Sequence, residues 1–240
     1  MKKFLIYLLL GMILPAQIPS LPAGERLEYT AQFNVIPAGK ATLSNLGVEE
    51  IDGDKTLHMR FEARTGAIAD RIFKIRDRID TWLYLDDLTT AHQEKRLREG
   101  NYRRKTSLRV DRIGKIITTR HDTFHIAEPI RDPYSLLYYL RTIPLSPGDT
   151  LRFNTFDNGT FTRFMTRITH REILHVPAGT YPCLVYSPFR EDASLFKNQG
   201  DMTVWFSDDK QKLPVQIVIK LKYGSLVMKL KRIKTAAAIP

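Results

Sequence analysis

Residues 215–230 read Val-Gln-Ile-Val-Ile-Lys-Leu-Lys-Tyr-Gly-Ser-Leu-Val-Met-Lys-Leu, and this stretch decides the fold class. Apolar residues recur at every second position on both sides of the Tyr223-Gly224 turn. Alternate residues of a strand point to the same face of a sheet. Two such runs joined by a short turn predict an antiparallel pair with one apolar face and one polar face.

The same alternation continues through most of the chain. It is clearest at 27–35 and 57–63, and again at 151–156 and 160–168, which are separated by Asp157-Asn158-Gly159. Asn-Gly between two alternating runs is a strong hairpin signal. Many strands joined by short turns favour antiparallel sheet over βαβ units. No long linker interrupts the pattern, so we expect a single β-rich domain over residues 24–240.

One segment has helical rather than strand periodicity. Asp132 suits the N-cap position and Pro133 the first helical position. Apolar residues then share one side at helical spacing, which predicts a helix over 132–143: Leu136, Leu137, Leu140 and Ile143. A shorter helical turn is a second candidate at 67–74. The fold class is therefore mainly β, a curved antiparallel sheet or partly open β-barrel wrapped around one central helix. We expect its concave side to be lined by the helix leucines and tyrosines and by Trp82, Trp205, Phe33, Phe61 and Phe153.

Two parts of the chain contain similar short motifs in the same order. Ile36-Pro-Ala-Gly39 is followed by Trp82 and an Asp pair, and Val176-Pro-Ala-Gly179 by Trp205 and another Asp pair. The spacing from Gly to Trp differs, 43 residues against 26. Chance and internal duplication both remain open, and a duplication would divide the domain into similar halves at about 26–125 and 145–233.

The first residues have the pattern of a secretory signal. Lys2-Lys3 precede an apolar run at 4–14, and small residues follow. The run is about half of the roughly 20 residues that cross a bilayer, and nothing later is as apolar. We therefore expect a signal peptide over 1–23, cut somewhere in 16–23. The mature protein would be periplasmic or secreted, with no transmembrane span.

The formal charge of +11 becomes +9 without Lys2 and Lys3. A basic protein outside the cytoplasm does not meet nucleic acid, so the anions within reach are lipid headgroups and envelope glycans. Basic residues cluster at 95–112 and 220–232. Two interpretations remain open: a solvated sheet face that blunts strand edges, or a dock for anionic lipid or glycan.

Catalytic and metal-binding motifs are not found. Cys183 is the single cysteine, so no internal disulfide forms, and its apolar context predicts a buried side chain. His121 and His125 lie in an extended context, where a spacing of four puts them about 13 Å apart. Asp86-Asp87 and Asp208-Asp209 suit polar turns. We therefore predict no metal site and no cofactor, and no enzyme class is indicated.

Taken together, these segments resemble a bacterial family, domain of unknown function 3108 (DUF3108), over about residues 26–233. The resemblance rests on motifs in a fixed order. They are Leu-Glu-Tyr-Thr-Ala-Gln-Phe-Asn-Val-Ile-Pro-Ala-Gly-Lys-Ala from Leu27, Ile-Arg-Asp-Arg-Ile-Asp at 75–80, Arg-Glu-Gly-Asn-Tyr at 98–102, Asp-Pro-Tyr-Ser-Leu-Leu-Tyr-Tyr-Leu-Arg from Asp132, Val-Pro-Ala-Gly-Thr-Tyr-Pro-Cys-Leu at 176–184, and Trp-Phe-Ser-Asp-Asp ahead of Leu-Pro-Val. The resemblance implies an exported β-rich protein of no settled activity. A more distant likeness, of architecture alone, is to periplasmic lipoprotein-carrier and sorting half-barrels that hold acyl chains.

The leading hypothesis is a non-enzymatic binding or carrier protein for an envelope lipid or glycan. Its candidate ligand contacts are Tyr134, Tyr138, Tyr139, Arg141, Trp82 and Trp205. One alternative is an enzyme acting on envelope polysaccharide, with Asp77, Asp80 or Asp132 as acid or base beside Arg76 or Arg141. Another is a scaffold that docks a second envelope protein. Neither the ligand nor the oligomeric state follows from the sequence.

Overall fold

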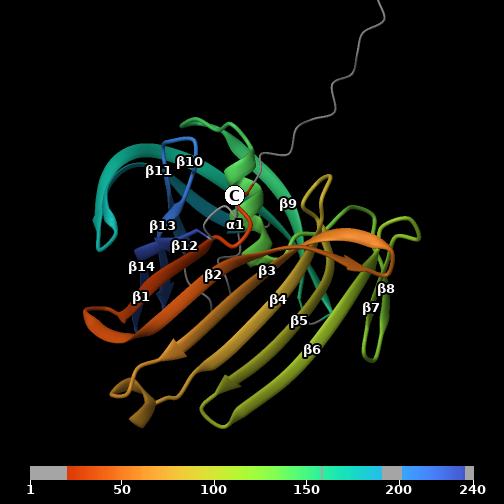
Figure 1. Ribbon diagram of the computed structural model, residues 1–240, viewed down its shortest axis with the longest axis horizontal. Helices are drawn as coiled ribbons and strands as arrows, with labels where there is room; N and C mark the ends of the chain where they lie inside the picture. Colours follow the sequence, from red (N-terminus) through yellow and green to blue (C-terminus); the bar gives the residue numbers. More distant parts are fainter. Residues whose placement is uncertain (1–20, 158, 191–201, 236–240) are drawn as a thin grey trace, which may run out of the picture.

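The computed structural model describes residues 21–157, 159–190 and 202–235 (Figure 1). Nearly all of the predicted signal segment, residues 1–23, lies outside this described part. Within it, one α-helix and one 3-10 turn accompany a large antiparallel sheet, which confirms the predicted mainly β class. The helix is α1 (Pro133–Thr142) and the turn is η1 (Ala69–Arg71). The strands are β1 (Arg26–Phe33), β2 (Ile36–Ile51), β3 (Asp54–Thr65), β4 (Arg76–Tyr84), β5 (Thr90–Glu99), β6 (Tyr102–Asp111), β7 (Ile116–Thr119), β8 (Thr123–His125), β9 (Thr150–Asp157), β10 (Thr160–Val176), β11 (Gly179–Arg190), β12 (Met202–Ser207), β13 (Pro214–Leu221) and β14 (Gly224–Lys234).

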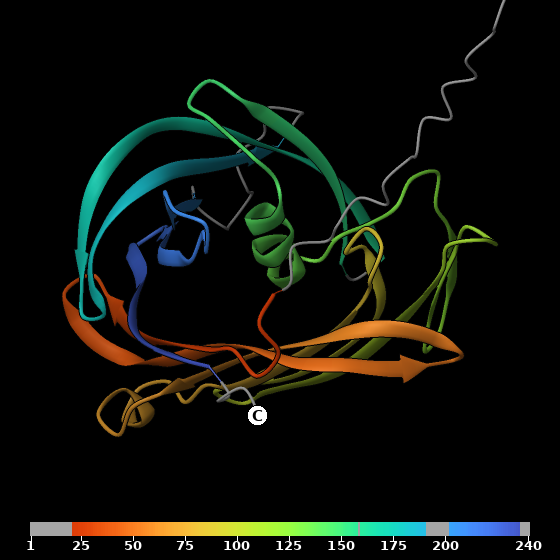
Figure 2. The same cartoon turned by 45° about the horizontal axis from the view of Figure 1, so that its top comes forward.

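All described strands belong to one sheet that curls around α1 (Figure 2). The strand order runs from β8 back to β1, then from β14 back to β9. Consequently the pairing of β1 with β14 joins the first and last strands of the chain. Such a sheet is a partly open barrel, because its edge strands β8 and β9 do not form a ladder with each other.

Apolar side chains close much of the gap between the two sheet edges. Phe124 of β8 packs edge-on against Phe156 of β9, with ring centroids 5.0 Å apart. Ile130 bridges to Asn154 beside them. A small separate core surrounds this seam, made of Leu108, Val110, Ile117, Ile126, Ile130 and Phe156. The seam is therefore held by side-chain packing and by this isolated bridge rather than by a strand ladder.

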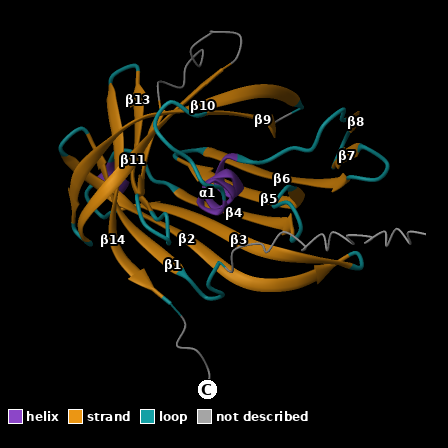
Figure 3. Ribbon diagram, turned by 90° about the horizontal axis from the view of Figure 1, so that it is seen from above, coloured by secondary structure: helices purple, strands orange, loops and turns teal. Residues whose placement is uncertain are grey.

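Helix α1 forms where the capping signals predict it. The Asp132 side chain accepts hydrogen bonds from the backbone N–H groups of Tyr134 and Ser135, and Pro133 opens the first turn. Leu136, Tyr138 and Leu140 are buried in the main core, so α1 lies inside the curve of the sheet (Figure 3). In the described part of the chain, no helix combines the length and apolar character needed to cross a membrane.

The concave face agrees only partly with the predicted lining. Phe61 of β3 does face inward, where its ring stacks on Tyr134 with centroids 4.5 Å apart, and Phe153 of β9 is buried in the core. The prediction for the two tryptophans is wrong. Trp82 alternates with the buried Thr81 and Leu83, and Trp205 with buried core residues on β12. Both indoles therefore leave the sheet on its outer face.

The predicted helical turn at 67–74 contracts to the short η1 turn. Ile68 and Ile72 are spaced for one helical face, but no element covers them, and both are exposed. Asp157 at the end of β9 pairs with Thr160 at the start of β10, as the Asp157–Gly159 signal predicts, and Asn158 lies outside the described residues. There Gly159 has φ +81°, a left-handed conformation that glycine adopts without strain.

Candidate functional site

The outer face of strands β2 to β6 carries most of the unusual polar chemistry. Met59 and Phe61 point toward α1, so the alternating residues His58, Arg60 and Glu62 point away from it. We call this side the outer face. Cross-strand pairing aligns its side chains in rows: His58 lies opposite Trp82, and Trp82 opposite His92.

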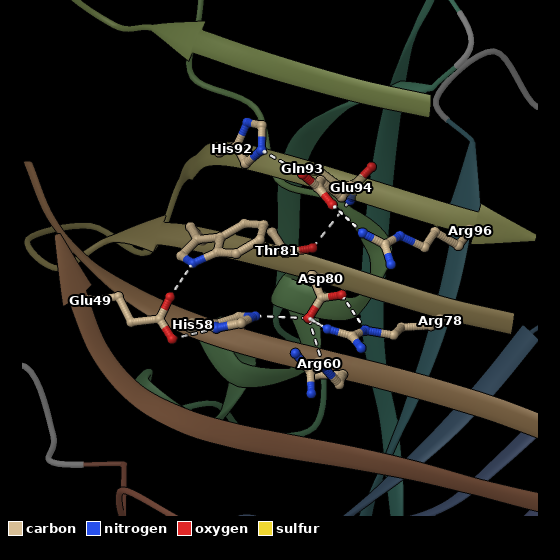
Figure 4. A network of polar contacts seen from close by, with 11 residues as sticks. Glu49, His58, Arg60, Arg78, Asp80, Thr81, His92, Gln93, Glu94 and Arg96 are labelled. Carbon is tan, nitrogen blue, oxygen red and sulfur yellow. Dashed lines mark hydrogen bonds and ion pairs between the residues drawn. The ribbon is translucent and has the colours of Figure 1, made fainter. Parts of the chain in front are cut away.

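His58 is the centre of a polar network (Figure 4). Its Nδ1 lies 2.9 Å from Oε1 of Glu49, and its Nε2 lies 2.8 Å from Oδ1 of Asp80. Both ring nitrogens face carboxylate oxygens, and both can donate only when the imidazole carries two protons. The ring also stacks on Trp82, with centroids 4.3 Å apart and planes inclined by 21°. The network thus joins β2, β3 and β4 through one side chain.

Asp80 is a buried anion held by three donors. Besides His58, it receives Arg60 Nε at 2.6 Å and Arg78 Nε at 2.6 Å. Burial alone would raise the pKa of the Asp80 carboxyl, but the hydrogen bonds from His58, Arg78 and Arg60 outweigh it and hold the pKa far below its usual range. An acid that stays ionised with both oxygens engaged cannot donate a proton as a general acid.

Glu49 and the aromatic residues complete the network. Trp82 Nε1 donates to Oε2 of Glu49 at 2.9 Å, and this bond, with that from His58, lowers the pKa of the Glu49 carboxyl. On the other side of Trp82, burial lowers the pKa of His92. Asp80 and Glu49 are therefore charged partners of His58, an arrangement that locks three strands together.

The other carboxylates of the enzyme alternative have different neighbours from those predicted. Asp132 caps α1 and lies far from solvent. Burial, the charge of Asp77 and a hydrogen bond with it raise the pKa of Glu99, so Asp77 interacts with Glu99 rather than with Arg76. The expected acid or base beside Arg76 or Arg141 is therefore not formed by these three aspartates.

Toward one end of the same strands, the outer face becomes uniformly basic. Five neighbouring strands place a basic side chain at corresponding positions. They are Lys40 on β2, Arg64 on β3, Arg76 on β4, Arg98 on β5 and Arg103 on β6. Lys40 pairs with Arg64, Arg64 with Arg76, and Arg98 with Arg103. We call this set the basic row. Like charges directly opposite each other destabilise a sheet, so packing does not account for it.

Two shallow depressions open along the basic row. One, of about 350 Å³, is bordered by Lys40, Arg64 and Arg76 together with residues 65–67 and Asp70. The other, of about 210 Å³, is bordered only by basic residues: Lys74, Arg76, Arg98 and Arg103. These hollows present several N–H donors from different strands to the same small volume.

Asp70 neutralises one member of the row. Its carboxylate accepts from Arg76 Nη1 at 3.0 Å and Nη2 at 2.5 Å, and also from the Thr65 hydroxyl. These hydrogen bonds lower the pKa of Asp70 to about 2. Within the described chain, no carboxylate pairs with Lys40, Arg64 or Arg98. Their charges are therefore free to meet an external anion.

The six predicted ligand contacts do not converge on one place. Arg141 forms a buried two-point ion pair with Glu25, with N–O distances of 2.6 and 2.9 Å, which engages its guanidinium inside the protein. Tyr138 is fully buried, and Tyr134 stacks on Phe61. The guanidinium carbon of Arg131 lies over the Tyr139 ring, 3.8 Å from its centroid. Trp82 and Trp205 lie on the outer face. Their role as ligand contacts stays a prediction that this geometry does not favour.

The remaining candidates for chemistry, the cysteine thiol and the metal-ligating side chains among the described residues, are not placed where they could react or bind a metal. Cys183 is fully buried, as predicted, and burial raises the pKa of its thiol to about 12. Across residues 21–157, 159–190 and 202–235, no three His, Cys, Asp or Glu side chains gather closely enough to hold a metal ion. Sequence reasoning recognised Arg98 and Arg103 as part of a basic cluster, named Arg76 only in the enzyme alternative, and missed Lys40 and Arg64. Only the strand register shows that the five belong together.

Comparison with known proteins identifies the family. The DUF3108 profile, described as a protein of unknown function, matches residues 28–231, and the chain therefore belongs to this family. No curated protein matches it.

Solved structures resemble the chain in fold. A beta-barrel-like DUF1849 protein from Brucella abortus has a TM-score of 0.56 at 9% identity, covering 90% of this chain and 99% of its own. An exported-protein candidate with a YmcC-like fold from Bacteroides fragilis has a TM-score of 0.34 at 11% identity, covering 89% of this chain and 96% of its own. The first likeness supports the curled-sheet architecture, and neither carries information on activity.

Proposed function

We propose that this member of the DUF3108 family is an exported, non-enzymatic envelope protein that binds an anionic group through its basic row. The group is the phosphate or carboxylate of an envelope lipid or glycan. The observation that supports the proposal is the run of like charges on five adjacent strands, where Asp70 borders the first hollow and only basic residues border the second.

The basic row has the chemistry of an anion site. Guanidinium groups present planar pairs of N–H donors that match the oxygens of phosphate or carboxylate. Bound oxygens would relieve the repulsion that Lys40, Arg64 and Arg76 exert on one another across the strands. Because the hollows are open to solvent, we expect binding to weaken as salt rises, over a screening length of about 8 Å at physiological ionic strength.

The concave side is less suited to the ligand. Helix α1 occupies it, Tyr138 is fully buried there, and Arg141 is bound to Glu25. A carrier that holds acyl chains inside would need α1 to move, whereas the basic row is accessible as it stands. The proposal therefore places ligand recognition on the outer face of β2 to β6.

Calorimetric titration of the exported protein tests the proposal. The probes are short-chain phosphatidylglycerol below its micelle concentration and polygalacturonate, which separate phosphate from carboxylate recognition. The variant Lys40→Ser/Arg64→Ser/Arg98→Ser should bind the preferred probe on the order of tenfold or more weakly, because three charges facing it are lost.

A charge-matched control removes three exposed basic residues elsewhere. Arg120→Ser/Lys210→Ser/Lys231→Ser lowers the net charge equally but leaves the basic row intact. It should bind nearly as the parent protein does. Equal losses in the two variants would show that affinity follows net charge and would overturn the proposed site. Binding of neither probe by the folded parent protein would overturn it as well.

A further inference from the structure

At one end of the sheet, the loops that connect the strands expose large apolar side chains. Ile68 and Ile72 in the β3–β4 connection are 78% and 87% exposed, and Val35 in the β1–β2 turn is 87% exposed. Ile36, Phe73 and Tyr223 add to them nearby. Scattered single exposed apolar residues are ordinary, but a gathering at one end of a molecule marks an interaction site.

Backbone hydrogen bonds show that these connections lie side by side. Asn34 N–H donates to Ser225 C=O, which joins the β1–β2 turn to the β13–β14 turn. Gly66 N–H donates to Ala38 C=O, which places the start of the β3–β4 connection beside β2. The β1–β2 turn, η1 and the β5–β6 turn follow one another along the lower left of Figure 1. We call this the tip end.

Basic residues surround the apolar tips. Arg71 and Lys74 flank Ile72 and Phe73 in the same connection, and Lys222 precedes Tyr223. Behind them stands the basic row: Lys40 is four residues along β2 from Ile36, about 13 Å at the rise of a strand. The tip end thus has apolar groups at its extremity and positive charge a short distance behind.

We infer that the tip end docks on the surface of an anionic lipid bilayer. Ile68 and Ile72 would enter the boundary between headgroups and acyl chains, and the basic row would meet the lipid phosphates. Apolar side chains that penetrate about 5–10 Å, combined with basic groups at headgroup level, are the standard composition of an interfacial anchor. The inference rests on the proposed function, because the basic row supplies its electrostatic part, and it names the source of the phosphate as a membrane.

The shape of the tip end favours a bilayer over a protein partner. Its apolar groups project from three separate turns rather than lining one groove, so they suit a deformable surface. The positive charges spread along five strands, matching a layer of phosphates rather than one acidic side chain. The opposite end offers a contrast: Ile113 in the β6–β7 turn is 92% exposed, but it stands beside the paired Arg112 and Asp86.

Sedimentation with vesicles tests the inference. Protein purified after export is mixed with vesicles of phosphatidylcholine alone or with one quarter phosphatidylglycerol. We expect binding to the anionic vesicles that falls with salt. Ile68→Ser/Ile72→Ser should lower the partition coefficient by about tenfold for each isoleucine that enters the bilayer. The control Ile113→Ser removes an equally exposed isoleucine from the other end and should change nothing.

The outcomes separate this inference from the proposed function. Unchanged vesicle binding by Ile68→Ser/Ile72→Ser, or an equal loss with Ile113→Ser, would overturn docking through the tip end. The same two variants should keep the parent affinity for soluble short-chain phosphatidylglycerol, because the basic row is intact. Binding of the soluble lipid without any vesicle binding would refute the membrane inference and leave the proposed function standing. Failure in both lipid assays, together with no binding of polygalacturonate, would remove both.

Discussion

The buried ion pair between Glu25 and Arg141 gives the sharpest test of how α1 is held. Only 3% of each side chain is exposed, and two N–O contacts of 2.6 and 2.9 Å join them. Arg141 Nε also donates to Gln211 C=O at 3.0 Å. The guanidinium therefore ties the helix to the segment before β1 and to the β12–β13 turn. Replacing Arg141 by Met keeps an unbranched apolar stem and removes the guanidinium with every one of these bonds.

We expect Arg141→Met to lower the free energy of unfolding by about 3–5 kcal/mol. Removing one partner of a buried pair leaves the other charge desolvated and uncompensated. At a urea dependence of about 2–3 kcal/mol per molar, the unfolding midpoint should fall by about 1–2 M. Urea titration followed by tryptophan fluorescence and by far-UV circular dichroism measures this shift.

The double variant Glu25→Leu/Arg141→Met provides the internal control. It removes both charges together, so it should recover most of the stability that the single variant loses. The exposed change Lys210→Met should shift the midpoint negligibly. A stability loss below about 1 kcal/mol for Arg141→Met would refute the reasoning from desolvation. So would a double variant whose stability loss equals the sum of the losses of Glu25→Leu and Arg141→Met.

Three further predictions follow from other contacts. Hydrogen bonds depress the pKa values of Asp80 and Glu49 in the folded protein, so the stability that these carboxylates contribute is complete above their unfolded pKa values, near pH 4 to 5. This contribution should decline as the pH falls below those values toward the folded ones. Thermal unfolding measured from pH 6 to 3 should therefore show a shallower loss of stability for Asp80→Asn than for the parent protein. A Cβ on Gly39 would lie 2.1 Å from Arg64 C=O, so Gly39→Ala should cost about 1–3 kcal/mol in urea unfolding, whereas Gly66→Ala, with open space around it, should cost far less. Tyr29 donates its buried hydroxyl to Pro214 C=O at 2.8 Å, so Tyr29→Phe should cost about 1–2 kcal/mol and the exposed Tyr223→Phe nearly nothing.

Local chemistry explains what the sequence could predict. Asp132 and Pro133 determine where α1 begins, because capping and a fixed φ act within a few residues. The alternation in 215–230 likewise determines β13 and β14, because side-chain direction in a strand follows position alone. Alternation through Ile79, Thr81 and Leu83 also places Trp82 on the outer face. The expectation that Trp82 lines the concave side did not follow this alternation, and position in the strand proved the better guide.

Long-range pairing explains what the sequence could not predict. Arg141 and Glu25 are separated by 116 residues, and nothing near either one indicates the other. The basic row is a property of register: a one-residue slip of β3 would turn Arg64 to the concave face. A linear reading sees basic residues at scattered positions, and only the paired strands show that they form one surface.

The two parts of the sheet share more geometry than their sequences suggest. In each, a tryptophan donates to a glutamate 33 residues earlier: Trp82 to Glu49, and Trp205 to Glu172. The glutamate sits on the first of three adjacent strands and the tryptophan on the third. The glutamate is also aligned, across the middle strand, with the residue two positions after the tryptophan. Glu49 pairs with Thr56, which pairs with Tyr84. Glu172 pairs with Cys183, which pairs with Ser207. Two similar halves at 26–125 and 145–233 stay a prediction, and these parallels favour it.

The difference between the two parts bears on where function lies. The residue opposite Trp82 is His58, which joins Glu49 to Asp80, whereas the residue opposite Trp205 is Val185, which forms no such bond. The network of charged residues therefore belongs to the first part, beside the basic row on the same strands. A network that fixes β2, β3 and β4 against one another also fixes Lys40, Arg64 and Arg76, whose mutual repulsion would otherwise push these strands apart. On this argument His58 and Asp80 would hold the basic row in place for the proposed anion site.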